Sequence, residues 1–194
     1  MADNNNDEEV AAAEANRAEV NRVTYVDTKI ALLQSDNPKE KLFNIVFHDF
    51  ENLPSEKGQY TVSNPFSCFG SDWQVGIYPG GDQKSSDGMV TVFLERCSEG
   101  RGLTVIYSMG IIAEEDRIIR QSKNTFDAEN DIWYYGDFCF LKDITGSEDV
   151  DGYLVDGALT IRVSMQLDEF VPKNPASSIM LKLFDDRKFS RCSV

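Results

Sequence analysis

The chain has 194 residues, of which 41% are apolar, and its 12 Phe, 7 Tyr and 2 Trp can fill one hydrophobic core. Its 33 Asp and Glu outnumber its 19 Lys and Arg, which gives a formal net charge of −14. A surface this acidic repels nucleic-acid phosphates and anionic lipid headgroups, so we expect neither a nucleic-acid nor a membrane partner.

Residues 1–40 form an acidic amino-terminal segment that we expect to be helical or partly disordered. The stretch EEVAAAEANRAEV has helix-forming composition. A thin apolar stripe runs along this segment at three- or seven-residue spacings. It is made of Val10, Ala13, Val20 and Val23, and Ile30, Leu32 and Leu33 could extend it. A solvated helix and a coiled coil both fit it, although a coiled coil needs about three or four full heptads. The acidic start lacks the positive charge of a targeting presequence, so we expect a cytoplasmic or nuclear protein.

From residue 41 the pattern changes to that of β-strands. Segments rich in β-branched and aromatic residues alternate with turns that contain Gly, Pro and Asp. Strands are expected near residues 43–49, 59–66, 71–79, 89–97, 102–112, 130–138 and 158–167. Many short strands without intervening helical patterns indicate an all-β antiparallel sandwich or barrel, which we assign to residues 41–168.

Period-two alternation identifies the side chains that should fill the core. In the segment WQVGIY, the residues Trp73, Val75 and Ile77 fall on one face of the strand. The last predicted strand places Leu159, Ile161, Val163 and Met165 on one face. After it, residues 169–194 form a Pro-containing linker and a short tail with an amphipathic helical pattern.

Histidine, cysteine and acidic clusters offer little for catalysis or metal binding. The four cysteines are far apart and form no CxxC pair, so reduced thiols are expected. His48 and Asp49 are neighbours on a predicted strand, where adjacent side chains point to opposite faces and cannot act as an acid–base pair. The segment EEDRIIR is predicted to be a solvated loop, and SEDVDG is only a weak cation-loop signal because the distal Glu is missing. We therefore expect no enzyme, no metal and no cofactor.

The segment DIWYYGDF is the most informative motif, because it has large side chains on both faces. Trp133 and Tyr135 share one face of an extended segment, and Ile132 and Tyr134 share the other. Such a segment cannot bury both faces in one core, so one face meets either a second sheet or a ligand. The pattern alone leaves core packing and partner binding equally open.

The order of these segments resembles the MATH (meprin and TRAF homology) domain. The landmarks are FNIVFHDF, SDWQVGIYPGG, VTVFLERC, LTVIYSMGII, IWYYGDFCFLKDI and DGYLVDGALTIRVSMQL, over residues 42–167. The resemblance implies an antiparallel sandwich of about eight strands, TRAF/MATH-like, that binds extended, Ser/Thr-rich peptides of partner proteins in a shallow groove.

Four residues match the groove positions of the resembled family: Phe93, Val105, Trp133 and Tyr135. Tyr134 stands where that family usually has glycine, and Val105 is smaller than the usual aromatic residue. Phe138 matches a second family Phe and is expected in the core.

The two ends suggest two different biological settings. The tail LKLFDDRKFSRCSV resembles the start of a BTB/POZ domain, which implies a substrate-recognition part of a cullin-3 ubiquitin ligase adaptor. Alternatively, the amino-terminal helix assembles the chain as a TRAF-like homo-oligomeric scaffold.

Overall fold

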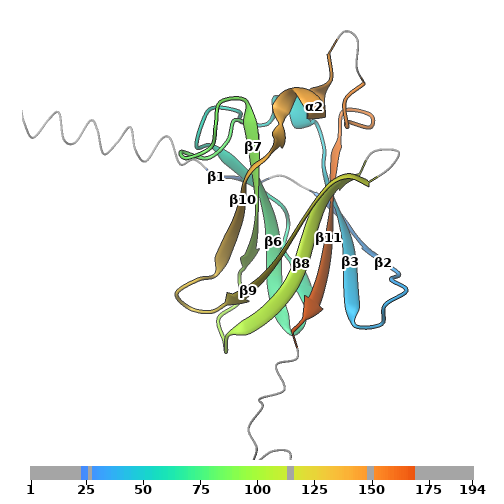
Figure 1. Ribbon diagram of the computed structural model, residues 1–194, viewed down its shortest axis with the longest axis vertical. Coiled ribbons are helices and arrows are strands. Elements are labelled where there is room, and N and C mark those ends of the chain that lie inside the picture. Colours follow the sequence, from blue (N-terminus) through green and yellow to red (C-terminus); the bar gives the residue numbers. More distant parts are fainter. Residues whose placement is uncertain (1–22, 26–27, 113–115, 148–150, 169–194) are drawn as a thin grey trace, which may run out of the picture.

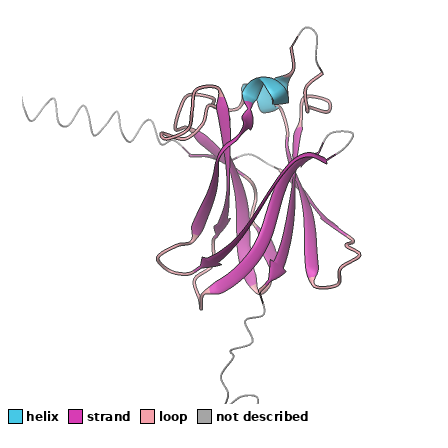
Figure 2. Cartoon of the chain, in the orientation of Figure 1, coloured by secondary structure: helices cyan, strands magenta, loops and turns pink. Residues whose placement is uncertain are grey.

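The computed structural model describes residues 23–25, 28–112, 116–147 and 151–168, and these form a β-sandwich of two sheets (Figures 1 and 2). The helices predicted in residues 1–22 and in the tail lie outside the described residues. The predicted antiparallel sandwich is confirmed, but it contains more than the expected eight strands.

The first sheet, here called the β7 sheet, has five strands in one path and a sixth beside it. The path is β1 (Val23–Tyr25), β4 (Tyr60–Val62), β6 (Ser71–Tyr78), β7 (Met89–Arg96) and β10 (Ile132–Phe140), and β5 (Phe66–Cys68) pairs with β6. All pairs are antiparallel except β1 with β4, which is parallel.

The second sheet, here called the β8 sheet, is entirely antiparallel. Its order is β2 (Lys29–Leu33), β3 (Glu40–Phe47), β11 (Leu159–Leu167), β8 (Leu103–Ile112) and β9 (Asp116–Phe126). A short 3₁₀ turn, η1 (Phe50–Asn52), follows β3, and one helical turn, α2 (Leu141–Thr145), follows β10. Within the described residues, no helix has the length and apolar character needed to cross a membrane.

The predicted core residues lie between the sheets. Trp73, Val75 and Ile77 are 0% exposed, as are Leu159, Ile161, Val163 and Met165. The Trp73 indole is also anchored, because its Nε1 donates a hydrogen bond to the Cys68 carbonyl at 2.8 Å and its ring meets Phe126 edge-on at 4.9 Å. Phe138, also expected in the core, is 1% exposed.

Two strands contradict the sequence interpretation. The stripe residues Ile30, Leu32 and Leu33 belong to strand β2, paired with β3, and do not extend a helix. The sandwich therefore includes residues that precede 41. The segment predicted as a solvated loop continues into β9, an edge strand of 11 residues. An edge strand with many polar residues gives no clear alternating pattern, which is why it was missed.

Two edge strands meet at one side of the sandwich. Strand β10 ends the β7 sheet and strand β9 ends the β8 sheet, and the two strands contact each other (Figure 1). This side carries the candidate site.

Candidate functional site

Strand β10 is a sheet edge with aromatic side chains on both faces. It pairs antiparallel with β7, placing Tyr134 opposite Phe93 and Trp133 opposite Leu94. Within the described residues, no strand is hydrogen-bonded to its other side. The backbone N–H and C=O groups of an edge strand can pair with another extended chain.

A bulge limits the regular part of this edge to residues 132–135. The register with β7 shifts between Tyr135 and Cys139, and Asp137 within the bulge has a positive φ of 48°. The Asp137 carboxylate accepts hydrogen bonds from the backbone N–H (2.9 Å) and the hydroxyl (3.0 Å) of Ser86. The bulge is thus fixed to the loop before β7, and the regular edge can pair with only a short segment.

The inner face of β10 connects the two sheets. The Trp133 indole Nε1 donates to the Thr125 carbonyl of β9 at 3.0 Å. The Tyr135 ring lies 5.6 Å from the Tyr107 ring of β8, and its hydroxyl points to the Tyr107 carbonyl at 3.4 Å. Both side chains are half-buried against the main core. They close the side of the sandwich and still keep a surface that a ligand can touch.

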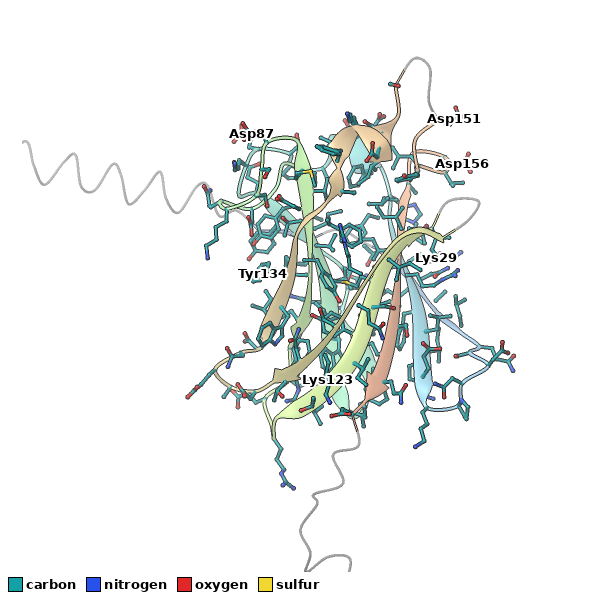
Figure 3. All side chains as sticks on the ribbon, viewed as in Figure 1. Lys29, Asp87, Lys123, Tyr134, Asp151 and Asp156 are labelled. Carbon is teal, nitrogen blue, oxygen red and sulfur yellow. The ribbon has the colours of Figure 1, made fainter. Side chains whose placement is uncertain are left out.

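The outer face of β10 continues a separate aromatic cluster. Tyr134, labelled in Figure 3, is 46% exposed. The centroid of its ring lies 5.4 Å from that of Phe93 and 6.3 Å from that of Tyr78. Tyr60 completes the group, 4.9 Å from Tyr78. We call Tyr60, Tyr78, Phe93 and Tyr134 the outer aromatic cluster. It is physically distinct from the main core between the sheets.

Burial raises the pKa of both Tyr134 and Tyr135 above the ordinary tyrosine value. Their hydroxyls therefore remain protonated at neutral pH and are able to donate hydrogen bonds. Tyr134 lies on the outer face of the edge, whereas the Tyr135 hydroxyl is already directed to the Tyr107 carbonyl.

The structure brings together only two of the four predicted site residues. Trp133 and Tyr135 share the inner face, whereas Phe93 lies on the opposite face of the same sheet, under Tyr134. Phe93 and Val105 are both 0% exposed, and Val105 belongs to the main core. Neither side chain reaches a surface in this structure, so the groove expected from Phe93 and Val105 must be corrected. The role of Trp133 and Tyr135 in binding remains a prediction.

The outer aromatic cluster was missed as a unit, although the sequence carried a signal for it. Gly76 and Tyr78 are out of phase with the core residues of β6, so they had to face outward. Large aromatic residues at such positions on neighbouring strands form cross-strand pairs.

The three cysteines within the described residues show no sign of activation. Cys68, Cys97 and Cys139 are free, and burial raises the pKa of Cys68 to about 11 and that of Cys139 to about 12. Both thiols are therefore protonated and unreactive near neutral pH. Within the described ranges, no group of three His, Cys, Asp or Glu side chains is placed to hold a metal ion.

Comparison with known proteins gives a family. The chain has no match among curated protein sequences. Among solved structures, one similar chain is Notothenia coriiceps TRAF5, at 10% identity and a TM-score of 0.41, with 84% of this chain and 83% of that chain covered. The family described as MATH domain matches residues 42–165, which is more than half of the sequence. The chain therefore belongs to the MATH domain family.

Proposed function

We propose that this protein is a non-enzymatic interaction module that binds an extended peptide along the β10 edge. MATH domains are in general protein-interaction modules that bind peptide segments of their partners. The observation that supports the proposal is the β10 edge, which no described strand pairs with and which carries an exposed tyrosine on one face and half-buried aromatic side chains on the other. Main-chain hydrogen bonds to such an edge give affinity, and the flanking side chains give specificity.

The edge determines how a peptide would be recognised. Side chains of an added strand alternate between the two faces of the sheet. Alternate residues of the peptide would contact Tyr134 on the outer face and the exposed parts of Trp133 and Tyr135 on the inner face. A short Ser/Thr-rich segment with one leading apolar residue suits this site, because Trp133 and Tyr135 offer apolar ring surface and the exposed Tyr134 adds a hydroxyl that can form a hydrogen bond.

The acidic surroundings favour the unphosphorylated form of such a segment. Coulombic interaction with Glu95, Asp82 and Asp131 contributes to the raised pKa of Tyr134, so negative charge surrounds this side chain. A phosphate would add about −1.5 to −2 charges beside these carboxylates. We expect phosphorylation of the peptide to weaken binding.

The test is calorimetry with peptides selected from a display library by the wild-type chain. Tyr134→Ala and Trp133→Ala should each weaken binding by about 1–3 kcal/mol. Phe140→Ala is the matched control, because Phe140 is also an aromatic residue of β10 and is 47% exposed, but lies beyond the bulge. Equal affinity in the wild type and both site variants would refute the site.

N-methylation of the selected peptide tests the backbone part of the proposal. Methyl groups on successive backbone nitrogens should weaken binding at every second position, because alternate N–H groups face the sheet edge. A loss without this alternation would refute strand addition and leave only side-chain contacts.

The cullin-3 adaptor role and the oligomeric scaffold are separate proposals, and both depend on segments outside the described residues. If the tail is only the start of a BTB-like region, this chain alone should not bind cullin-3 in a pull-down. If the amino-terminal segment assembles the chain, analytical ultracentrifugation at tens of micromolar should show an oligomer; a monomer would remove the scaffold proposal.

A further inference from the structure

A pocket of about 370 Å³ lies at the end of the sandwich, between the loop that joins β7 to β8 and the loop that joins β9 to β10. Its lining includes Arg96, Cys97, Glu99, Gly100, Asp127 and Asp131. None of these residues is proposed to contact the peptide at β10, although the charge of Asp131 also acts on Tyr134. The pocket is therefore a second place where a ligand can be held.

Arg96 forms the inner wall of the pocket and is only 7% exposed. Its Nε donates to the Ser71 hydroxyl at 3.0 Å, and its Nη1 donates to the carbonyls of Arg101 (2.8 Å) and Phe126 (3.2 Å). Within the described part of the chain, neither a hydrogen bond from Nη2 nor an ion pair of Arg96 with a carboxylate occurs. Among the described side chains, only Thr61 Oγ1 is both sealed from solvent and without a partner, so Nη2 keeps contact with solvent and can donate to an acceptor that enters the pocket.

The free nitrogen lies at the pocket wall beside Gly100. A Cβ on Gly100 would sit 3.1 Å from Nη2, and the φ of Gly100 is +150°. A side chain at this position would crowd Nη2, whereas glycine leaves it accessible. Gly100 also lines the pocket, so an acceptor there can approach Nη2.

Three acidic residues on the two loops line the same pocket. Glu99 and Asp131 are exposed, and Asp127 uses one carboxylate oxygen to accept the backbone N–H groups of Glu129 and Asn130. These two hydrogen bonds hold the pKa of Asp127 below its ordinary value, so it is ionised at neutral pH. The lining thus contains one guanidinium and three carboxylates, which makes the pocket acidic overall. A ligand that is itself an anion would meet this excess negative charge.

We infer that this pocket binds a lysine or arginine residue of a partner protein. The cationic side chain lies among Glu99, Asp127 and Asp131, and the main-chain carbonyl of the same residue accepts a hydrogen bond from Arg96 Nη2. The ligand thereby supplies a hydrogen-bond acceptor for Nη2 and a positive charge that balances the excess of carboxylates. The net charge of −14 on the chain attracts such a basic segment at long range. This inference does not depend on peptide binding at β10.

The experiment is an NMR titration of the ¹⁵N-labelled full chain with capped amino acids. The probes are the N-acetyl N-methylamides of arginine, lysine, norleucine and glutamate, together with butylguanidinium, which has the cation but no carbonyl. Arginine and lysine probes should shift the amide signals of residues 97–100 and 127–131 saturably, and added salt should weaken the effect. Butylguanidinium should bind more weakly than the arginine probe.

Three variants distinguish binding in the pocket from attraction to the general negative charge of the surface. Glu99→Gln and Asp131→Asn should each lower the affinity for the arginine probe by about two- to five-fold, as for exposed ion pairs. Glu129→Gln removes the same charge from the same loop, but its side chain does not line the pocket, so its effect should be much smaller. Equal effects of all three variants, equal binding of the norleucine or glutamate probe, or displacement of the arginine probe by Mg²⁺ would each overturn the inference.

Discussion

Replacement of Gly76 by alanine should destabilise the fold by about 1–3 kcal/mol, because the added methyl group overlaps a buried ring. An ideal Cβ at this position would lie 1.9 Å from Cζ and 2.1 Å from Cε1 of Phe93. The Phe93 ring is 0% exposed and is held by Tyr78 at 5.6 Å and Tyr134 at 5.4 Å. It cannot move aside without disrupting the outer aromatic cluster.

The size of the effect combines two opposing terms. Overpacking costs about 1–3 kcal/mol, and a contact this short falls in the upper part of that range. Alanine also restricts the unfolded chain more than glycine does, which returns about 0.4–1 kcal/mol. The net change is therefore a loss of stability.

Urea denaturation measures this loss directly. Gly136→Ala is the matched control, because a Cβ there meets nothing within 4 Å, and it should leave stability unchanged or raise it by up to about 1 kcal/mol through the same effect on the unfolded chain. Phe93→Leu should reduce the cost of Gly76→Ala by about 1 kcal/mol or more, since the two positions are in contact. A Gly76→Ala variant as stable as Gly136→Ala would refute the packing of Phe93 over Gly76.

Three further predictions concern the core, the dependence of stability on acidic pH and the reactivity of one thiol. Trp73→Ala should cost about 3–5 kcal/mol in the same denaturation assay, and unchanged stability would contradict its place in the core. Hydrogen bonds from Ser164 and Ser35 lower the pKa of Glu40 in the folded protein. The ionised Glu40 therefore stabilises the fold at pH values above its ordinary pKa of 4.5, and this stabilisation is lost as the pH falls through the lower pKa of the folded state. Glu40→Gln should thus be less stable than wild type at pH 7, and thermal denaturation should show this difference shrinking as the pH falls below 4.5. Burial, together with the charges of Glu95, Asp72 and Asp131, raises the pKa of Cys97 to about 11. Asp131→Asn should lower this pKa and so speed the alkylation of Cys97 by iodoacetamide at pH 9, as followed by peptide mass spectrometry. An unchanged rate would contradict this electrostatic influence.

Side-chain alternation predicted much of the fold from the sequence. Trp73 and the apolar residues of β11 were placed correctly because period two is strict where one face of a strand is buried. Short apolar runs such as KIALL are ambiguous between helix and strand, and only the partner strand β3 decides this one.

The candidate site was predicted less completely, because it depends on register between strands. Alternation correctly separated Trp133 and Tyr135 from Tyr134. It could not show that Phe93 lies opposite Tyr134, since that requires the pairing of β7 with β10. Likewise, the acidic pocket joins residues of two loops that only the packed sandwich brings together.

The place of β11 in its sheet has a consequence for synthesis on the ribosome. This strand is among the last described residues, yet it lies between β3 and β8 and pairs with both. Until residue 167 has left the exit tunnel, β3 and β8 each lack a neighbour and expose backbone groups to other nascent chains. Pairing Ser164 with Leu42 then closes a very long stretch of chain, a step that slows folding. Chaperone demand should therefore be greatest during translation, and a circular permutant that places β11 before β1 should fold faster than the natural order, because β11 and β3 are then closer in sequence.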